Sequence, residues 1–171
     1  MTDSSNTVLS RIQRLVELQN ARTTALEETL QKEKSFIQEI KQYALTQPFN
    51  PDCLYIAGQI FEQEHDSLNA LTNYHKAALL NHQPSKQQYQ LLETELLKTI
   101  PQLRDQKQYS QAMEYCAVLL ELNSQHTHAT YFAGTIHIQQ QNIEQAIACF
   151  EKLPNHSSAQ AQLAKLRAIY L

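Results

Sequence analysis

The side chains best suited to chemistry in this sequence are its histidines and cysteines. His126 and His128 stand in the run HTH, and His137 follows His128 by nine residues on the same predicted helix. Chelation of a metal by one helix needs ligands about one turn apart, and this spacing does not provide them. The sequence therefore predicts no metal site.

The three cysteines, Cys53, Cys116 and Cys149, are odd in number and far apart. Such a set indicates free thiols in a reducing compartment rather than a disulfide framework. Cys53 has no Lys or Arg nearby in the sequence, and Cys149 has only Lys152 one turn away. A reactive thiol needs a positive neighbour that lowers its pKa, so we expect inert cysteines.

Catalytic motifs are missing from the sequence. It has no Gly-rich phosphate loop, HExxH, CxxC or GxSxG. The carboxylates of Asp52, Glu62, Glu64 and Asp66 lie in a stretch without Lys or Arg, and they are typical of a solvated acidic face. We expect a protein that is not an enzyme and that uses no cofactor.

Composition narrows the class further. The chain of 171 residues has 14 basic and 17 acidic residues, and no basic stripe that would bind nucleic acid. No apolar run approaches the length of about 18 residues that a membrane span needs, which predicts no direct membrane insertion and a cytoplasmic protein. Only two glycines and five prolines, among many helix formers, predict an all-α fold.

Both glycines occur in nearly the same six-residue segment, YIAGQI at residues 55–60 and YFAGTI at 131–136. In each copy an alanine follows the glycine by 12 residues and an aromatic residue follows four later. Ala112 and Cys116 repeat this last spacing between the two copies, and Ala112 precedes Ala146 by 34 residues. A period of this length predicts stacked helical hairpins.

This pattern resembles the tetratricopeptide repeat (TPR) family. In the first repeat, residues 51–84, the consensus positions of the family are occupied by Leu54, Ala57, Gly58, Phe61, Ala70, Tyr74, Ala77 and His82. The third, 127–156, matches the same positions with Thr130, Ala133, Gly134, His137, Ala146, Phe150 and Leu153, and Ser158 just beyond it stands at the last position. The middle repeat, 85–126, is eight residues longer and offers Leu96, Thr99, Ile100, Leu103, Ala112, Cys116, Leu119 and Ser124. The resemblance implies an all-α solenoid of antiparallel hairpins over residues 48–171, closed by a capping helix at 157–171.

Local signals place the helix boundaries. Asn50, Pro51 and Asp66 are expected at helix starts, and Asn142 is a further candidate cap. A small residue lets two helices approach, so Gly58 and Gly134 are expected where the paired helices cross. Pro101 removes one helical hydrogen bond and is expected to kink or split the first helix of the middle repeat, about 85–106.

Residues 1–47 form a separate N-terminal segment. Its apolar residues follow the a and d positions of a heptad, which predicts a coiled coil or a docking helix. The expected interface comprises Leu9, Ile12, Val16, Leu26, Leu30, Ile37 and Ile40. Two alternatives remain for this segment: it projects and pairs with a partner or with itself, or it folds back at residues 19–24 and packs on the solenoid.

The resemblance also implies a function. In TPR proteins the first helices of the hairpins line a concave groove, which here would comprise Asp52, Tyr55, Gln59, Glu62, Leu97, Arg104, His128, Tyr131, Thr135 and Ile138. The expected protein is a scaffold or adaptor that binds a partner peptide or helix there. An alternative is a dedicated chaperone for a secreted client, because three repeats behind an N-terminal helix are similar to type III secretion translocator chaperones. The alternative role for Tyr55 and Tyr131 is structural: they pack between neighbouring hairpins.

Overall fold

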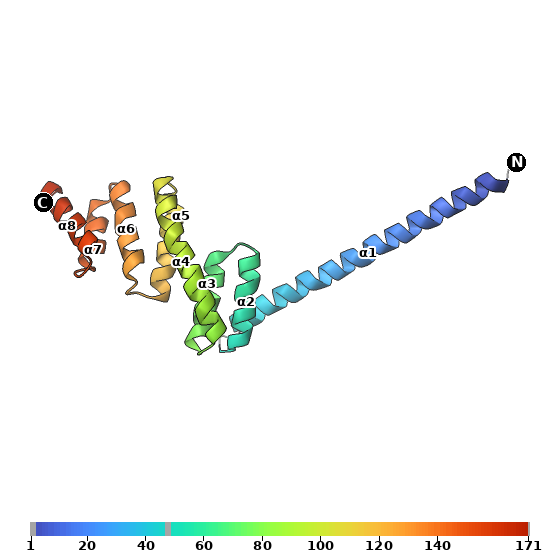
Figure 1. Ribbon diagram of the computed structural model, residues 1–171, viewed down its shortest axis with the longest axis horizontal. Helices are drawn as coiled ribbons and strands as arrows, with labels where there is room; N and C mark the ends of the chain where they lie inside the picture. Colours follow the sequence, from blue (N-terminus) through green and yellow to red (C-terminus); the bar gives the residue numbers. More distant parts are fainter. Residues whose placement is uncertain (1–2, 47–48, 171) are drawn as a thin grey trace. The chain divides into compact units, whose positions relative to one another are not determined.

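The computed structural model describes residues 3–46 and 49–170, with eight helices and no strand in those ranges (Figure 1). The all-α prediction is confirmed. The chain divides into two compact units, Met1–Gln47 and Pro48–Leu171. Side chains are described from Arg14 onward, except at 15, 20, 44, 45, 47, 48 and 171.

The first unit is one helix, α1 (Asp3–Thr46), of 44 residues. It runs without a break through residues 19–24, so the helix does not fold back there. The segment contains neither Gly nor Pro, and the hydroxyls of Thr23 and Thr29 bond to the carbonyls of Gln19 and Ala25 at 2.9 Å along the helix. The side chains of Leu9 and Ile12 lie outside the described residues. Within the part of the chain that the structure describes, no helix combines the length and apolarity that a membrane crossing requires.

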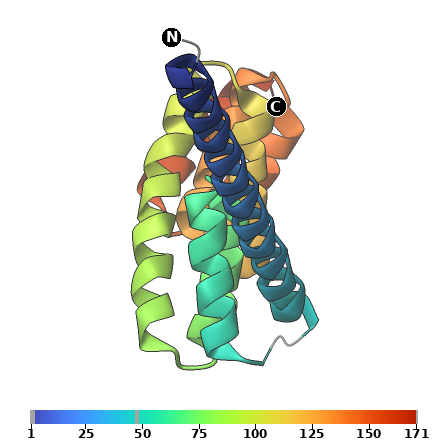
Figure 2. The same cartoon turned by 90° about the vertical axis from the view of Figure 1, so that its right-hand side faces the viewer.

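The second unit contains seven helices, and consecutive helices pack against one another as antiparallel neighbours (Figures 1 and 2). They are α2 (Pro51–Gln63), α3 (Ser67–Leu79), α4 (Gln83–Asp105), α5 (Tyr109–Leu122), α6 (Thr127–Gln139), α7 (Ile143–Glu151) and α8 (Ser157–Tyr170). One core cluster joins α3, α4, α5 and α6 around residues such as Tyr74, Ile100 and Cys116. A second joins α7 and α8 around Phe150 and Leu163.

Side-chain caps begin several of these helices. Asn50 accepts from the N–H of Cys53 at 3.1 Å, and Asp66 accepts from the N–H of Asn69 at 3.2 Å, as expected for both. Asn142 stands at the start of α7, but its side chain makes no capping bond. The caps of α2 and α3 are therefore asparagine and aspartate, which are among the preferred N-cap residues.

Four helices end on a residue in the left-handed region, and none of these residues is glycine. His65, Asn81, Lys107 and Gln141 follow α2, α3, α4 and α6 with φ between 61° and 64°. At α4 the N–H of Lys107 bonds to the carbonyl of Arg104 and the N–H of the next residue bonds to Leu103, which is the Schellman pattern. The two glycines of the chain are used elsewhere.

Helix α4 is longer than its neighbours and is not split at Pro101. It runs from Gln83 to Asp105, two residues earlier than expected, with Pro101 inside it. Proline removes a single hydrogen bond, and Ile100 and Leu103 are buried on either side of it, so tertiary packing holds the helix together. His82, the N-cap of α4, meets Asp52 at the start of α2, and the second half of α4 lies beside α6.

The glycines make room for aromatic rings. A Cβ built on Gly58 would lie 2.5 Å from Cε1 of Tyr74, and one on Gly134 would lie 2.5 Å from Cε1 of Phe150. The expected close approach is present, but the partner is the ring of the second helix rather than its backbone. The aromatic residue therefore packs directly over the glycine instead of beside the helix crossing.

Candidate functional site

The predicted groove residues of the first repeat lie on α2, and three of them bind within the chain. Asp52 pairs with His82, Oδ1 to Nε2 at 3.4 Å, and Glu62 accepts a hydrogen bond from the hydroxyl of Tyr74 at 2.7 Å. The ring of Tyr55 lies 5.8 Å from that of Tyr74 and 5.0 Å from that of His82. Asp52, Gln59 and Glu62 are exposed, and Tyr55 is half-buried.

The structure brings together predicted residues of the second and third repeats. Nη1 of Arg104 on α4 donates to Oγ1 of Thr135 on α6 at 3.3 Å. Arg104 also pairs with the neighbouring Asp105 at 2.8 Å. Leu97 is half-buried against the core two turns before Arg104, and His128 is exposed at the start of α6. Arg104 and Thr135 thus lie where α4 meets α6.

Tyr131 and Ile138 are half-buried against the second core cluster. The ring of Tyr131 stacks on that of His156 at 4.8 Å and lies 6.0 Å from that of Phe150. Tyr55 and Tyr131 thus make the same kind of contact: each packs on an aromatic residue of its own hairpin and on the histidine that begins the next helix. These contacts match the packing alternative, and each ring keeps an exposed part.

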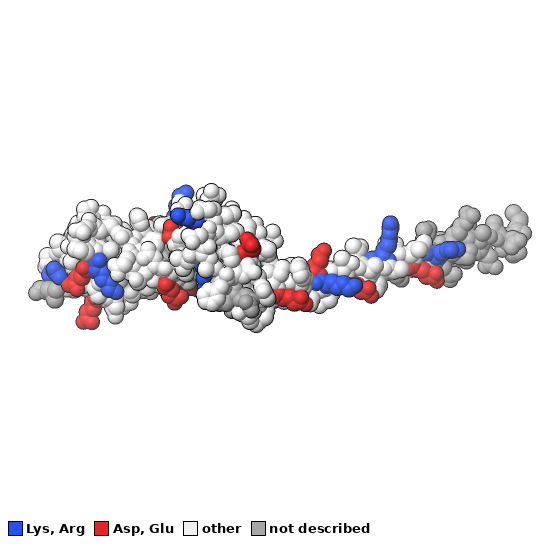
Figure 3. All heavy atoms as spheres, turned by 90° about the horizontal axis from the view of Figure 1, so that it is seen from below, with Lys and Arg blue, Asp and Glu red and all other residues white. Residues whose placement is uncertain are grey.

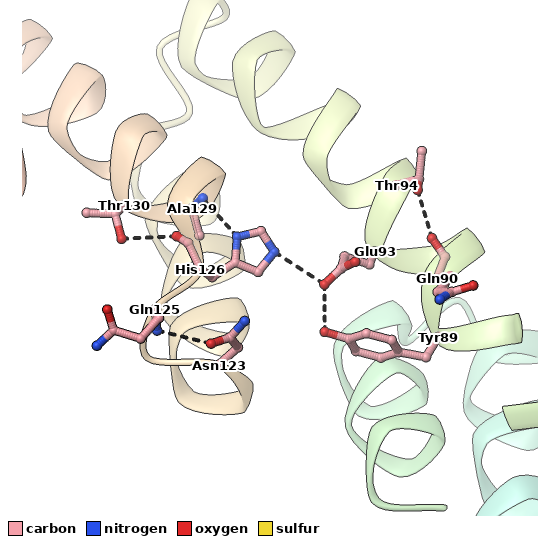
Figure 4. Close-up of polar contacts among 9 residues, drawn as sticks. All are labelled: Tyr89, Gln90, Glu93, Thr94, Asn123, Gln125, His126, Ala129 and Thr130. Carbon is pink, nitrogen blue, oxygen red and sulfur yellow. Dashed lines mark hydrogen bonds and ion pairs between the residues drawn. The ribbon is translucent and has the colours of Figure 1, made fainter. Parts of the chain in front are cut away.

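A chain of polar contacts that the sequence did not predict joins α4 to α6 (Figure 4). The hydroxyl of Tyr89 donates to Oε1 of Glu93 at 2.6 Å, and Nε2 of His126 lies 3.2 Å from the same oxygen. On the other side of the ring, the N–H of Ala129 donates to Nδ1 of His126 at 3.2 Å. The ring of His75, from α3, lies 5.0 Å from that of Tyr89.

The polar protons of Tyr89 and His126 are used in hydrogen bonds that hold α4 to α6. Because Nδ1 of His126 accepts from a backbone N–H, Nε2 carries the ring proton and donates it to Glu93. Burial, together with the bond to Glu93, raises the pKa of Tyr89, so its hydroxyl remains a donor. The arrangement leaves the imidazole without an acceptor nitrogen for general-base chemistry. It fastens the start of α6 to the middle of α4.

His126 belongs to a repeated device that sequence reasoning missed. Nδ1 of His82, His126 and His156 accepts a hydrogen bond from the N–H three residues later, at 3.2, 3.2 and 3.1 Å. These histidines begin α4, α6 and α8, the helices that open each new layer. The detectable signal is a histidine followed at the third position by a small residue, Ser85, Ala129 or Ala159.

An open depression of about 370 Å³ lies where the end of α3 meets the first half of α4. Its walls include His75, Leu79, Lys86, Tyr89 and Glu93. Leu79 is 70% exposed, and Lys86 is exposed beside it. The depression offers one apolar contact between groups of opposite charge, a lining suited to a side chain of a bound protein rather than to a reacting small molecule.

The three cysteines and His137 are at least partly buried in the fold. Burial raises the pKa of Cys53 and of Cys149, although Lys152 opposes the latter, and it raises the pKa of Cys116 to about 12. Nδ1 of His137 is buried and has no hydrogen-bond partner among the described residues. Across residues 3–46 and 49–170, no three His, Cys, Asp or Glu side chains gather as metal ligands would.

Charged side chains of both signs are interspersed on each unit. Along α1 basic and acidic groups follow one another, and on the visible face of the second unit they are scattered between uncharged areas (Figure 3). No basic patch is visible on that face. The visible face is therefore mixed in charge.

Comparison with known proteins identifies the repeats. The family model of the tetratricopeptide repeat matches residues 103–170, from the end of α4 to the end of α8. A search of curated proteins returned no match to this chain. The hairpin of α2 and α3, which precedes the matched segment, repeats its geometry, because Tyr74 covers Gly58 as Phe150 covers Gly134. Residues 103–170 therefore match the tetratricopeptide repeat, which the sequence pattern of the chain also resembles.

Proposed function

We propose that residues 49–170 form a protein-interaction module whose binding surface is the side presented by α2, α4 and α6. Tetratricopeptide repeats stack into solenoids that present extended binding surfaces, so the family supports the general role. The residues expected to contact the partner are Gln59 and the exposed parts of Tyr55, Leu97, His128 and Tyr131. An extended peptide or a helix with apolar anchors fits such a surface.

The observation that carries this proposal is the bond between Arg104 and Thr135. It brings the first helices of two successive repeats side by side at predicted binding positions, so a partner could touch both repeats at once. The second support is Asp52, whose side chain is 83% exposed although it pairs with His82. An exposed carboxylate at this end of the surface would favour a basic residue of the partner.

Co-purification followed by mass spectrometry, with surface variants, tests the proposal. The double variant Gln59→Lys and His128→Lys alters two exposed residues of the first helices. The matched control, Gln111→Lys and Gln145→Lys, makes the same change of charge on exposed residues of α5 and α7. We expect the first variant to lose the partner and the control to retain it. Loss from both, or from neither, contradicts a binding surface on the first helices.

We further propose that α1 provides a second attachment, which makes the chain an adaptor or assembly subunit. The side presented by α2, α4 and α6, the first helices of the three hairpins, is called the first-helix surface. Removal of residues 1–46 should then leave partner binding at this surface intact but detach the module from its assembly. The chaperone alternative predicts a different result: one client co-purifies, and it becomes insoluble when the chain is absent.

A further inference from the structure

Helix α1 presents a heptad seam over its described part. The a positions are Val16, Thr23, Leu30 and Ile37, and the d positions are Gln19, Leu26, Glu33 and Ile40. Val16 and Leu30 are each 52% exposed and Leu26 is 71% exposed. Four successive heptads are enough for a stable coiled coil. The seam is therefore long enough to pair with another helix.

We propose that α1 pairs with α1 of a second copy of this chain, as a parallel and in-register two-stranded coiled coil. The inference rests on the proposed role of α1 as an attachment and names its partner. In a parallel pair each g residue faces the e residue five positions later on the other helix. Arg22 is at g and Glu27 is at e, so the dimer contains two identical pairs of opposite charge.

The charges disfavour the antiparallel alternative. An antiparallel pair places a residues against d residues and e residues against e residues. The register that brings Leu26 to Leu30 of the other helix then places Glu27 against Glu27. Like charges at this position repel, whereas the parallel arrangement pairs each Glu27 with an Arg22.

The polar residues in the seam favour zero offset between the copies. Gln19 and Thr23 then meet their own counterparts, and each side chain both donates and accepts hydrogen bonds. An offset of one heptad would instead place Leu26 against Glu33 and Thr23 against Leu30. Polar residues at such positions are known to specify register at a cost in stability.

The number of strands follows from the a positions. Three of the four described a residues, Val16, Thr23 and Ile37, are β-branched, and Leu26 stands at d. This combination favours two strands over three, whereas the heptad with Ile37 at a and Ile40 at d does not add to that preference. The cost of the arrangement lies at Glu33, where two carboxylates meet in the seam.

Exchange of the two charges tests the orientation in the full chain. Arg22 and Glu27 have no charged residue three or four positions away on their own helix, so their exchange leaves helix stability little changed. Arg22→Glu alone or Glu27→Arg alone converts two attractive pairs into two repulsive ones, and we expect each to raise the dimer dissociation constant about tenfold. The double variant restores both pairs and should restore the affinity.

The matched control is Glu39→Arg, which makes the same charge change as Glu27→Arg at a c position, away from the seam, and which likewise has no charged residue three or four positions away. It should leave the dissociation constant unchanged. Glu33→Leu should tighten the dimer about tenfold or more, because it removes the two carboxylates from the seam. Sedimentation equilibrium gives the dissociation constant, and circular dichroism verifies that each variant keeps its helix content.

Three outcomes would overturn the inference: a monomer at every concentration, a trimer, or a charge exchange whose double variant is no better than the single ones. The proposed function is tested separately, since partner capture by the first-helix surface does not need α1. A monomeric chain that still binds its partner would exclude the dimer alone. A dimer that captures nothing would exclude the binding surface alone.

Discussion

The hydroxyl of Tyr74 donates a hydrogen bond to Oε2 of Glu62 at 2.7 Å, and the corresponding places of the third repeat hold Phe150 and Ile138. One repeat thus has a polar pair where the other has an apolar pair. Burial and the bond to Glu62 raise the pKa of Tyr74, so its hydroxyl remains protonated and remains a donor.

This pairing predicts coupling between the two residues. Tyr74→Phe should lower the free energy of unfolding by about 1 kcal/mol, the usual net value of such a bond. The same change in a Glu62→Ile background should cost much less, because the acceptor is already gone. A double-mutant cycle by urea denaturation measures the coupling. Phe150→Tyr is the control: Ile138 offers no acceptor, so this change should bring no gain in stability.

The aromatic rings over the glycines give a second prediction. Gly134→Ala should destabilise the protein by about 1–3 kcal/mol, because the new Cβ would stand 2.5 Å from the fully buried ring of Phe150. Helix propensity alone would give the opposite sign, a gain of about 1 kcal/mol. Urea denaturation distinguishes the two signs.

A companion variant tests the cause. Phe150→Leu removes the ring, so Gly134→Ala in that background should be neutral or stabilising. Equal losses in both backgrounds would show that the ring is not what excludes the side chain.

The repeats could be predicted because spacing along the chain records them directly. Gly58 and Gly134 recur with the same alanine and aromatic residue behind them, and hairpins of the predicted kind are present. What the glycines contact was not predictable in the same way. Spacing shows that a small residue is required, but whether a backbone or a ring fills the space depends on the packing of the second helix.

Three other features could not be predicted from the sequence, because each depends on tertiary contacts: the continuity of α4, the contact of His126 with Glu93, and the bonds of the groove residues. Pro101 signals a break, and only the burial of Ile100 and Leu103 explains why α4 continues through it. The contacts of His126 with Glu93 join residues from different repeats, and no local pattern records such a pair. The groove residues were placed by resemblance, and their internal bonds, such as that between Asp52 and His82, depend on side-chain packing.

The left-handed helix ends give a third prediction. Lys107 has φ of 62°, which strains any residue with a Cβ. Lys107→Gly should therefore stabilise the protein by about 0.5–1 kcal/mol, the relief of strain exceeding the entropy of the more flexible unfolded chain. Lys107→Ala is the control: it removes the same charge but keeps the Cβ, and it should give no gain. A gain of equal size for Ala would attribute the effect to the charge.

The capping histidines give a fourth prediction. His126→Ala should lower the free energy of unfolding by about 2 kcal/mol, about half from the lost cap and half from the lost bond to Glu93. His126→Asn should recover the first half, because asparagine caps helices well but does not reach Glu93. If Asn and Ala lose the same amount, the cap contributes nothing. Thermal and urea unfolding followed by circular dichroism give both values.

The unpartnered ring of His137 gives the last prediction, which concerns pH. Burial lowers the pKa of His137 below its ordinary value of 6.5, so the folded state resists the proton that the unfolded state accepts. The neutral ring's contribution to stability is thus fully present above about pH 6.5 and is lost as the pH falls through the lowered pKa.

His137→Phe removes this titration and places at residue 137 the residue that the first repeat has at Phe61. It also replaces the buried Nδ1, which has no partner among the described residues, with carbon. We expect the variant to be more stable than the parent at pH 8 and its advantage to widen at pH 5. The six other histidines are common to both proteins, so the difference between the two unfolding free energies isolates His137. A constant difference across this range would mean that the ring of His137 takes up its proton as readily in the folded state as in the unfolded one.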